Sequence, residues 1–127
     1  MVYFDKVSKI YSQTMTALED VSFSIEPQEF VSLVGQSGAG KTTILKLLLA
    51  EEKPTSGKVF FESKDVNSLS RRELPALRRR IGCVFQEFRL LPSKTAYENI
   101  AFAMEAAGKE DEEINENAMQ VLSLVGL

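Results

Sequence analysis

The sequence contains no histidine and no tryptophan, and it has a single cysteine, Cys83. Without histidine, the chain has no imidazole to serve as a metal ligand or a general base. One cysteine cannot form an intramolecular disulfide, which favours a reducing, cytoplasmic compartment. The net charge of −3 is not the basic excess that is typical of nucleic-acid-binding proteins, so we expect no nucleic-acid partner.

Long hydrophobic runs are also missing. The apolar run at residues 44–50 is interrupted by Lys46, and it is far shorter than the ~20 residues that span a bilayer. The first residues lack the basic region and the apolar stretch of a signal peptide. The sequence therefore predicts no direct membrane span, so that any membrane role must come through a partner. The chain of 127 residues, 44% of them hydrophobic, is long enough for one domain with a core.

The hydrophobic pattern predicts an α/β chain whose first half is rich in strands and whose last third is helical. Runs of β-branched, aromatic or alternating apolar residues predict strands, and 3.6-residue periodicity predicts helices. Ser70 and Glu73 have the spacing of a capping box at the start of a helix. The expected strands span 2–7, 21–25, 30–34, 58–61 and 81–85, and the expected helices span 42–50, about 70–80, 95–107 and 110–124.

Several charged or reactive residues have a structural interpretation. The arginines between positions 71 and 80 are interpreted as a solvated helix face. The acidic residues between positions 110 and 116 form the negative start of a helix, which suits the helix dipole. Cys83 lies in a predicted strand, where we expect it to pack in the core.

The strongest feature is a glycine-rich loop that ends in a lysine and a threonine. Residues 35–42 match G-x-x-x-x-G-K-[ST], and they lie between a predicted buried strand and a predicted helix, as this motif requires. Backbone N–H groups of such a loop converge on phosphates, and the helix start adds unpaired N–H groups and a positive dipole end. The sequence therefore predicts a site for ATP with Mg²⁺. The alternative is a chance glycine-rich turn.

The residues of this loop have distinct expected roles. Its glycines keep side chains away from the phosphates, and Lys41 adds a cation for the β- and γ-phosphates. The Thr42 hydroxyl is the expected protein ligand of Mg²⁺, and Thr43 can donate to the α-phosphate. The predicted phosphate-binding residues are Gly35, Gln36, Ser37, Gly38, Ala39, Gly40, Lys41, Thr42 and Thr43.

Further motifs flank the loop on both sides. They occupy residues 9–11, 17–23, 54–57 and 84–86, and together with the loop they follow the order and spacing of the ATP-binding-cassette (ABC) family. The resemblance covers essentially the whole chain. It implies a P-loop NTPase core with an N-terminal antiparallel β subdomain, at about 1–87, followed by the Q-loop and the start of a helical subdomain, at about 88–127.

Two longer stretches narrow this resemblance. Residues 77–92, Thr95 and residues 98–100 are similar to the branch that contains lipoprotein-release ATPases, macrolide-export ATPases and a bacterial cell-division ATPase. Residues 47–52, where most relatives carry a glycine-containing segment, and residues 86–91 favour the cell-division member. The resemblance implies an ATP-binding subunit that acts with an integral-membrane, permease-like partner at the inner face of the cell membrane.

The resemblance assigns roles to two residues outside the loop. Tyr11 falls where the family places an aromatic ring that stacks on adenine, although taken alone it could simply end a strand. Gln86 falls on the Q-loop glutamine, whose amide oxygen reaches Mg²⁺ or its water and responds to the γ-phosphate. Taken alone, Gln86 is an ordinary polar loop residue. In the family, the segment after this glutamine contacts the membrane partner.

Several motifs of the family are missing from the sequence. It contains no Leu-Ser-Gly-Gly-Gln signature, no apolar strand ending in Asp-Glu, no D-loop and no switch histidine. Lys41 and Gln86 supply only part of the charge stabilisation that phosphoryl transfer needs, so the catalytic set is incomplete. We interpret the chain as the N-terminal half of an ABC ATPase that forms a homodimer at full length. Alone, it is expected to bind nucleotide weakly and to hydrolyse it negligibly.

Three alternatives stay open at this point. One is a lipoprotein-release or macrolide-export ATPase of the same branch. Another is a nucleotide-binding module that never hydrolyses ATP. The third is a small-molecule kinase with a similar loop, which would have no reason to carry the segments around Tyr11 and Gln86.

Overall fold

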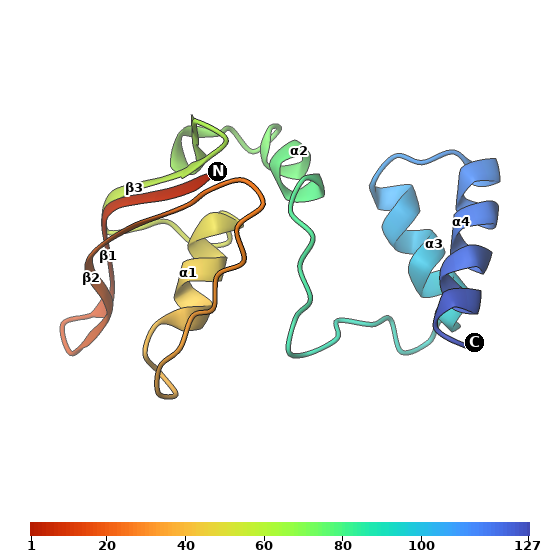
Figure 1. Ribbon diagram of the computed structural model, residues 1–127, viewed down its shortest axis with the longest axis horizontal. Helices are drawn as coiled ribbons and strands as arrows, with labels where there is room; N and C mark the ends of the chain where they lie inside the picture. The colour runs from red at the N-terminus through yellow and green to blue at the C-terminus, as the bar shows by residue number, and fades with distance from the viewer. The chain divides into compact units, whose positions relative to one another are not determined.

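The computed structural model describes residues 1–127, and these divide into two compact units, Met1–Ile81 and Gly82–Leu127. The first unit contains the β-sheet with helices α1 and α2, and the second contains helices α3 and α4 (Figure 1). The fold combines an antiparallel sheet with helices, as the sequence predicts. The subdomain boundary near residue 87 stays a prediction.

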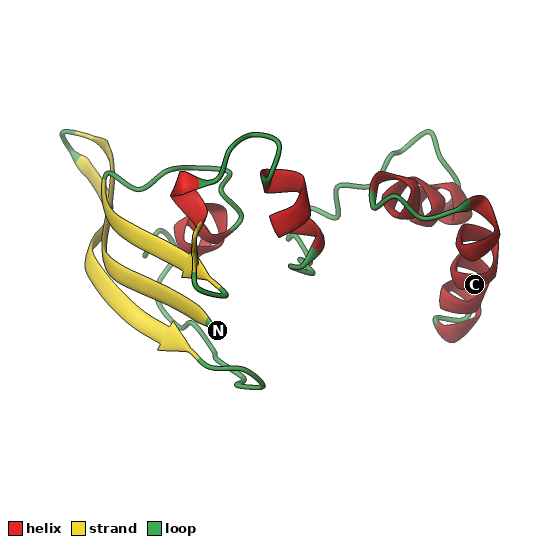
Figure 2. Cartoon of the chain, turned by 90° about the horizontal axis from the view of Figure 1, so that it is seen from above, coloured by secondary structure: helices red, strands yellow, loops and turns green.

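The sheet of the first unit is antiparallel, with the strand order β2-β1-β3-β4. Figure 2 shows its three long strands lying side by side. Phe4 of β1 pairs with Phe23 of β2 on one side and with Val59 of β3 on the other. The Phe4 and Phe23 rings stack, with their centroids 4.6 Å apart. The strands are β1 (Val2–Ser12), β2 (Met15–Ile25), β3 (Ser56–Phe61) and β4 (Lys64–Asp65).

One hydrophobic core holds the sheet against the helices of the first unit. Helix α1 spans Lys41–Leu48, a 3₁₀ turn spans Val66–Ser68, and α2 spans Leu74–Arg79. Leu47 of α1 is fully buried, which contributes about 1.5–3 kcal/mol relative to an exposed leucine. The core residues are Phe4, Val7, Leu18, Leu47, Val59, Val66 and Leu77.

The predicted capping box at Ser70 forms only in part. The Glu73 carboxylate accepts hydrogen bonds from the Ser70 backbone N–H at 2.9 Å and from its hydroxyl at 2.7 Å. Helix α2 nevertheless begins at Leu74, with Pro75 in its first turn. Proline is tolerated there because the first N–H groups of a helix have no intrahelical acceptor. Ser70 therefore closes the turn before α2 rather than capping the helix.

Two predicted strands do not form. Residues 30–34 have neither helix nor strand, and Phe30 and Val34 are 94% and 92% exposed. Residues 81–85 are likewise irregular, so Cys83 is half-buried rather than packed within a strand. The apolar composition favours a strand at both places, but no other segment of the chain pairs with either run.

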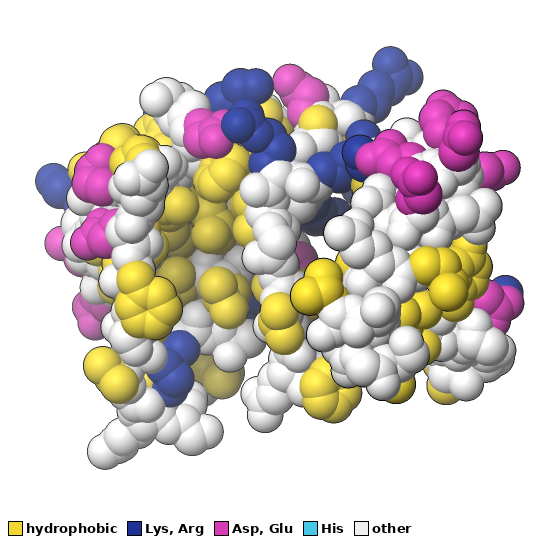
Figure 3. All heavy atoms as spheres, turned by 45° about the vertical axis from the view of Figure 1, so that its right-hand side comes forward, with side chains coloured by type: hydrophobic (Ala, Val, Ile, Leu, Met, Phe, Trp, Pro, Cys, Tyr) yellow, Lys and Arg dark blue, Asp and Glu magenta, His cyan; other side chains and the backbone are white.

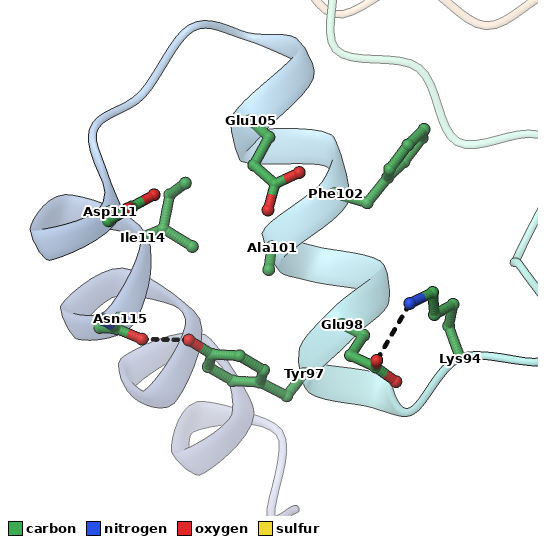
Figure 4. Close-up of a pocket in the computed structure, with 9 residues that line it drawn as sticks. All are labelled: Lys94, Tyr97, Glu98, Ala101, Phe102, Glu105, Asp111, Ile114 and Asn115. Atoms are coloured by element: carbon green, nitrogen blue, oxygen red, sulfur yellow. Dashed lines mark hydrogen bonds and ion pairs between the residues drawn. The ribbon is translucent and has the colours of Figure 1, made fainter.

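The second unit is a helical hairpin of α3 (Ala96–Ala106) and α4 (Asp111–Leu124). Thr95 and Glu98 form a complete capping box at the start of α3. Figure 4 shows Tyr97 reaching from α3 to Asn115 of α4, where its hydroxyl donates to the Asn115 amide oxygen. Ile114 and Ala118 of α4 are buried. The predicted helices at 95–107 and 110–124 are thus confirmed to within a residue or two at each end.

Acidic side chains and exposed hydrophobic side chains occupy different parts of the surface of the helical unit. Acidic side chains gather at the start of α4, and exposed hydrophobic side chains gather elsewhere on the unit (Figure 3). No helix of the protein is long and apolar enough to span a membrane.

Candidate phosphate-binding site

The site is built where the loop of residues 35–40 enters helix α1. Gly40 is the N-cap residue and has a left-handed backbone, with φ of 86°. A Cβ atom at this position would lie 2.4 Å from the Ala17 carbonyl oxygen and 2.8 Å from Leu18 Cδ2. The close approach of the helix start to β2 therefore requires glycine, for both steric and conformational reasons.

The start of α1 presents backbone N–H groups without acceptors. Gly40 provides no side-chain cap, and the first backbone hydrogen bond at this end runs from Ile44 N to the Gly40 carbonyl, at 3.1 Å. The N–H groups of Lys41, Thr42 and Thr43 precede that bond. Unpaired N–H groups at a helix N-terminus, with the positive end of the dipole, bind phosphate.

Lys41 lies across the loop that precedes it. Its ammonium Nζ donates to the Gly35 and Gln36 carbonyl oxygens, each at 2.7 Å. An ammonium has three N–H donors, so it can exchange these carbonyls for phosphate oxygens. The structure thus places the Lys41 cation, the loop and the free N–H groups together.

The rest of the loop has little side-chain obstruction. A Cβ at Gly38 would meet no atom within 4 Å, although its φ of 82° favours glycine, and a Cβ at Gly35 would come within 3.3 Å of the Ala39 methyl group. Gln36, Ser37 and Ala39 are exposed. A single backbone hydrogen bond, from Ala39 N to the Gln36 carbonyl at 3.2 Å, tightens the turn.

Tyr11 lies beside the start of α1. Its hydroxyl is 3.4 Å from Thr43 Oγ1, and Thr43 is buried. The Lys9 ammonium lies over the Tyr11 ring, 5.0 Å from its centroid. Tyr11 is 42% exposed, so it retains surface for a ligand next to the loop. The structure therefore brings Tyr11 and the phosphate loop together, although they are far apart in the sequence.

No pattern in the sequence predicts the charge cluster behind Tyr11. Glu52 pairs with Lys9 at 3.2 Å and with Lys46 at 3.1 Å. Burial tends to raise the pKa of Glu52, but hydrogen bonds from Tyr11, Lys46 and Lys9 lower this pKa by more, and the carboxyl group stays ionised. The same Glu52 hydrogen bond raises the pKa of Lys46.

Arg78 is exposed, as predicted for the arginines between positions 71 and 80, but it also contacts the end of α1. Its guanidinium donates to the Leu49 carbonyl at 2.9 Å and to the Ala50 carbonyl at 3.2 Å. These carbonyls end α1, so Arg78 satisfies acceptors that have no partner within the helix. Arg80 also makes an ion pair, with Glu62.

The two predicted Mg²⁺ ligands differ in their positions. Thr42 is exposed in the first turn of α1, and a single hydroxyl is a suitable protein ligand because Mg²⁺ keeps several waters and takes other oxygens from phosphates. Gln86 is exposed and belongs to the second unit, so its role stays a prediction. No cluster of three or more carboxylate or thiol side chains could hold a metal ion elsewhere.

Comparisons with known proteins identify the class of this chain. The ABC transporter family model matches residues 18–127. In the solved structures, the ATP-binding cassette MJ0796, a dimer in a post-hydrolysis state bound to ADP and Pi, matches with a TM-score of 0.88 and 36% identity. That match covers 100% of this chain and 58% of the cassette. The chain belongs to the ABC transporter family.

Among curated proteins, the chain is similar to the cell division ATP-binding protein FtsE. It is 50% identical to FtsE of Mycobacterium tuberculosis over 128 residues and 44% identical to FtsE of Bacillus subtilis over 127, each covering 100% of this chain and 56% of the relative. It is also 43% identical, over 130 residues, to the methionine import ATP-binding protein MetN 1 of Bacillus thuringiensis, covering 100% of this chain and 38% of the relative. The chain thus spans little more than half the length of these FtsE proteins.

Proposed function

We propose that this chain binds ATP with Mg²⁺ as the nucleotide-binding part of an FtsE-like ABC ATPase. The observation that carries the proposal is the start of α1, where unpaired N–H groups, the Lys41 ammonium and a loop that requires glycine converge. Tyr11 beside Thr43 adds an aromatic surface for the base. The bound ADP and Pi in the similar MJ0796 cassette support a nucleotide ligand.

Each residue then has a defined task. The N–H groups of Lys41–Thr43 and the loop hold the phosphates, Lys41 neutralises the β- and γ-phosphates, and the Thr42 hydroxyl takes one position on Mg²⁺. Mg²⁺ supplies charge neutralisation on the phosphates. Gln86 is proposed as the residue that senses the γ-phosphate. Hydrolysis also needs a group that positions water, and no residue described here fills that role, so we propose that hydrolysis depends on residues outside this sequence.

The identity with FtsE proteins supports a role in bacterial cell division. We propose an FtsX-like integral-membrane partner, which would hold the ATPase at the cytoplasmic face of the membrane, and a homodimer of the full-length protein. The segment that follows Gln86 exposes apolar side chains, with Phe88 80% and Leu90 65% exposed. Exposed apolar groups of this kind favour protein contacts. Co-purification of the chain with an FtsX-like protein from membranes, lost in Phe88→Asp and kept in Met119→Asp, which changes an exposed residue of α4, would test this partner.

Transport is the second candidate function, because the similarity to methionine import proteins is almost as high as that to FtsE. A transport ATPase would differ from a cell-division ATPase in its membrane partner and not in its nucleotide site. A permease of the methionine import type co-purifying in place of an FtsX-like protein would favour transport.

The nucleotide proposal is tested by titrating the chain with a fluorescent ATP analogue and Mg²⁺. Lys41→Ala should lower the affinity by about tenfold or more, because hydrogen bonds to charged groups contribute about 1.5–3 kcal/mol each. The matched control is Lys58→Ala, which removes an exposed lysine from β3 of the same unit. Equal affinities of folded Lys41→Ala and Lys58→Ala chains would contradict the proposal.

A further inference from the structure

The cluster of Lys9, Lys46 and Glu52 has no part in holding phosphates, yet it is tightly arranged. Glu52 contacts Lys46 through Oε1 at 3.1 Å and Lys9 through Oε2 at 3.2 Å. The Lys9 and Glu52 side chains are only 16% and 21% exposed. Most surface ion pairs are far more exposed and contribute little, so this cluster calls for a structural or a functional explanation.

The turn that ends α1 brings Glu52 to this place. Ala50 has a left-handed backbone, with φ of 51°, and the N–H groups of Glu51 and Glu52 both donate to the Lys46 carbonyl, at 2.8 and 3.3 Å. The chain therefore folds back over the last turn of α1. As a result, Glu52 lies next to Lys46 of the helix and within reach of β1.

Lys9 connects the cluster to Tyr11. The two residues lie near the irregular end of β1, and the Lys9 ammonium is 5.0 Å from the centroid of the Tyr11 ring. The Lys9 ammonium donates to the Lys53 carbonyl at 2.8 Å, pairs with Glu52, and lies over the Tyr11 ring. Its long side chain, which would otherwise be mobile, is therefore fixed by partners on three sides.

The Tyr11 side chain is held at its ring face and at its hydroxyl, and the hydroxyl also hydrogen-bonds the Glu52 carboxylate. The ammonium lies over one face of the ring, and the hydroxyl contacts Thr43 in the first turn of α1. A base can then stack only on the other face. A cation over an aromatic ring contributes about 0.5–2 kcal/mol, enough to favour one ring orientation over others. Glu52, just beyond the far end of α1, contacts both Lys9 and the Tyr11 hydroxyl.

We propose that Glu52 is a positioning residue for the adenine end of the nucleotide site. This inference rests on the proposed ATP binding. Glu52 holds Lys9 over one face of Tyr11 and leaves the other face turned to the base, while the phosphates are bound independently by the loop. Loss of the Glu52 charge frees Lys9 and lets the ring turn, which weakens the binding of the base and leaves the binding of the phosphates intact.

The experiment compares two ligands that share the phosphates. Affinities for Mg-ATP and for inorganic tripolyphosphate with Mg²⁺ are measured by calorimetry for the chain and for Glu52→Gln. We expect ATP affinity to fall about three- to tenfold, in line with a lost ring contact, and tripolyphosphate affinity to change less than twofold. Lys9→Met, which keeps the aliphatic stem, should likewise lower ATP affinity and leave tripolyphosphate affinity nearly unchanged. Glu52→Asp should lower ATP affinity less than Glu52→Gln does.

Two further variants decide between a positioning role and a general structural role. Tyr11→Ala should lose ATP affinity, and adding Glu52→Gln to it should cost nothing more, because both changes act on the same ring. Glu62→Gln removes a carboxylate that pairs with Arg80 in the same unit, and it should leave both affinities unchanged.

The results distinguish a failure of the proposed positioning role of Glu52 from a failure of the proposed ATP binding. If the unchanged chain binds neither ligand, the proposed ATP binding fails. If it binds both and Glu52→Gln weakens both equally, or weakens neither, the positioning role is overturned. Additive losses in the double variant with Tyr11→Ala overturn it as well.

Discussion

The two ends of helix α1 are built in opposite ways. At the N-terminal end, Gly40 gives no side-chain cap and the first N–H groups have no acceptor. At the C-terminal end, the Leu49 and Ala50 carbonyls accept hydrogen bonds from Arg78. One end is left open and the other is closed by the protein itself.

This difference shows how a short helix can serve as a binding element. Eight residues of isolated helix would not be stable in water, so the helix depends on tertiary contacts. These contacts are the buried Leu47 and the bonds at the C-terminal end. Because stabilisation comes from there, the N-terminal end can remain uncapped for a ligand. Changes at the two ends should therefore have separable effects on binding and on stability.

The largest effect is expected from Gly40→Ala at the open end. The added methyl group would lie 2.4 Å from the Ala17 carbonyl oxygen, and the residue would keep φ near 86°. A left-handed conformation alone costs a residue with a side chain about 1–2 kcal/mol, and the clash adds to it. We expect a loss of about 2–4 kcal/mol in the free energy of unfolding, measured by urea denaturation.

Gly38→Ala is the matched control for this change. Gly38 has a similar φ of 82°, but its Cβ would meet no atom within 4 Å. Gly38→Ala should therefore lower the free energy of unfolding by only about 1–2 kcal/mol. Equal losses for the two variants would show that the approach of the loop to β2 is looser than described here.

A smaller effect is expected from Arg78→Ala at the closed end. The change removes both hydrogen bonds to the last carbonyls of α1. Because Arg78 is exposed, we expect a loss of about 1–2 kcal/mol in the free energy of unfolding, while nucleotide affinity changes less than twofold. Arg72→Ala, an exposed arginine of the preceding turn, should be neutral by the same denaturation measurement. A large loss of nucleotide affinity in folded Arg78→Ala would show that the two ends are coupled.

The smallest effect is expected from Ala50→Gly in the turn that follows α1. Ala50 has φ of 51°, which glycine adopts without strain, although glycine also loses more entropy on folding. We expect a net gain of about 0.5–1 kcal/mol in thermal denaturation. Ala103→Gly, in the middle of α3, should instead lose about 1 kcal/mol. A destabilised Ala50→Gly chain would contradict the described turn.

Local patterns in the sequence were sufficient to predict most of the elements and the glycine-rich loop before α1. The spacing of residues 35–42, the helix after it and the alternation in β2 depend on neighbouring residues alone. The same holds for α3 and α4, although the complete capping box lies at Thr95 rather than at Ser70.

The parts that sequence reasoning missed depend on partners far along the chain. Residues 30–34 have the composition of a strand, but a strand forms only where another pairs with it. The pairs between Lys9 and Glu52, and between Arg78 and the end of α1, join residues more than 25 positions apart. Residues 47–52 serve in the sequence only to distinguish branches of the family, and nothing in them predicts the pairing of Glu52 with Lys9.

The central claim, that the open end of α1 holds the phosphates, is tested most directly by two-dimensional ¹H–¹⁵N NMR spectra of the chain with and without Mg-ATP. The account predicts that the largest shifts fall on the backbone amides of Gly38, Gly40 and Lys41–Thr43, while the amides of α3 and α4 change little. Shifts concentrated on α3 and α4, with the amides of the loop and of the start of α1 unchanged, would contradict it.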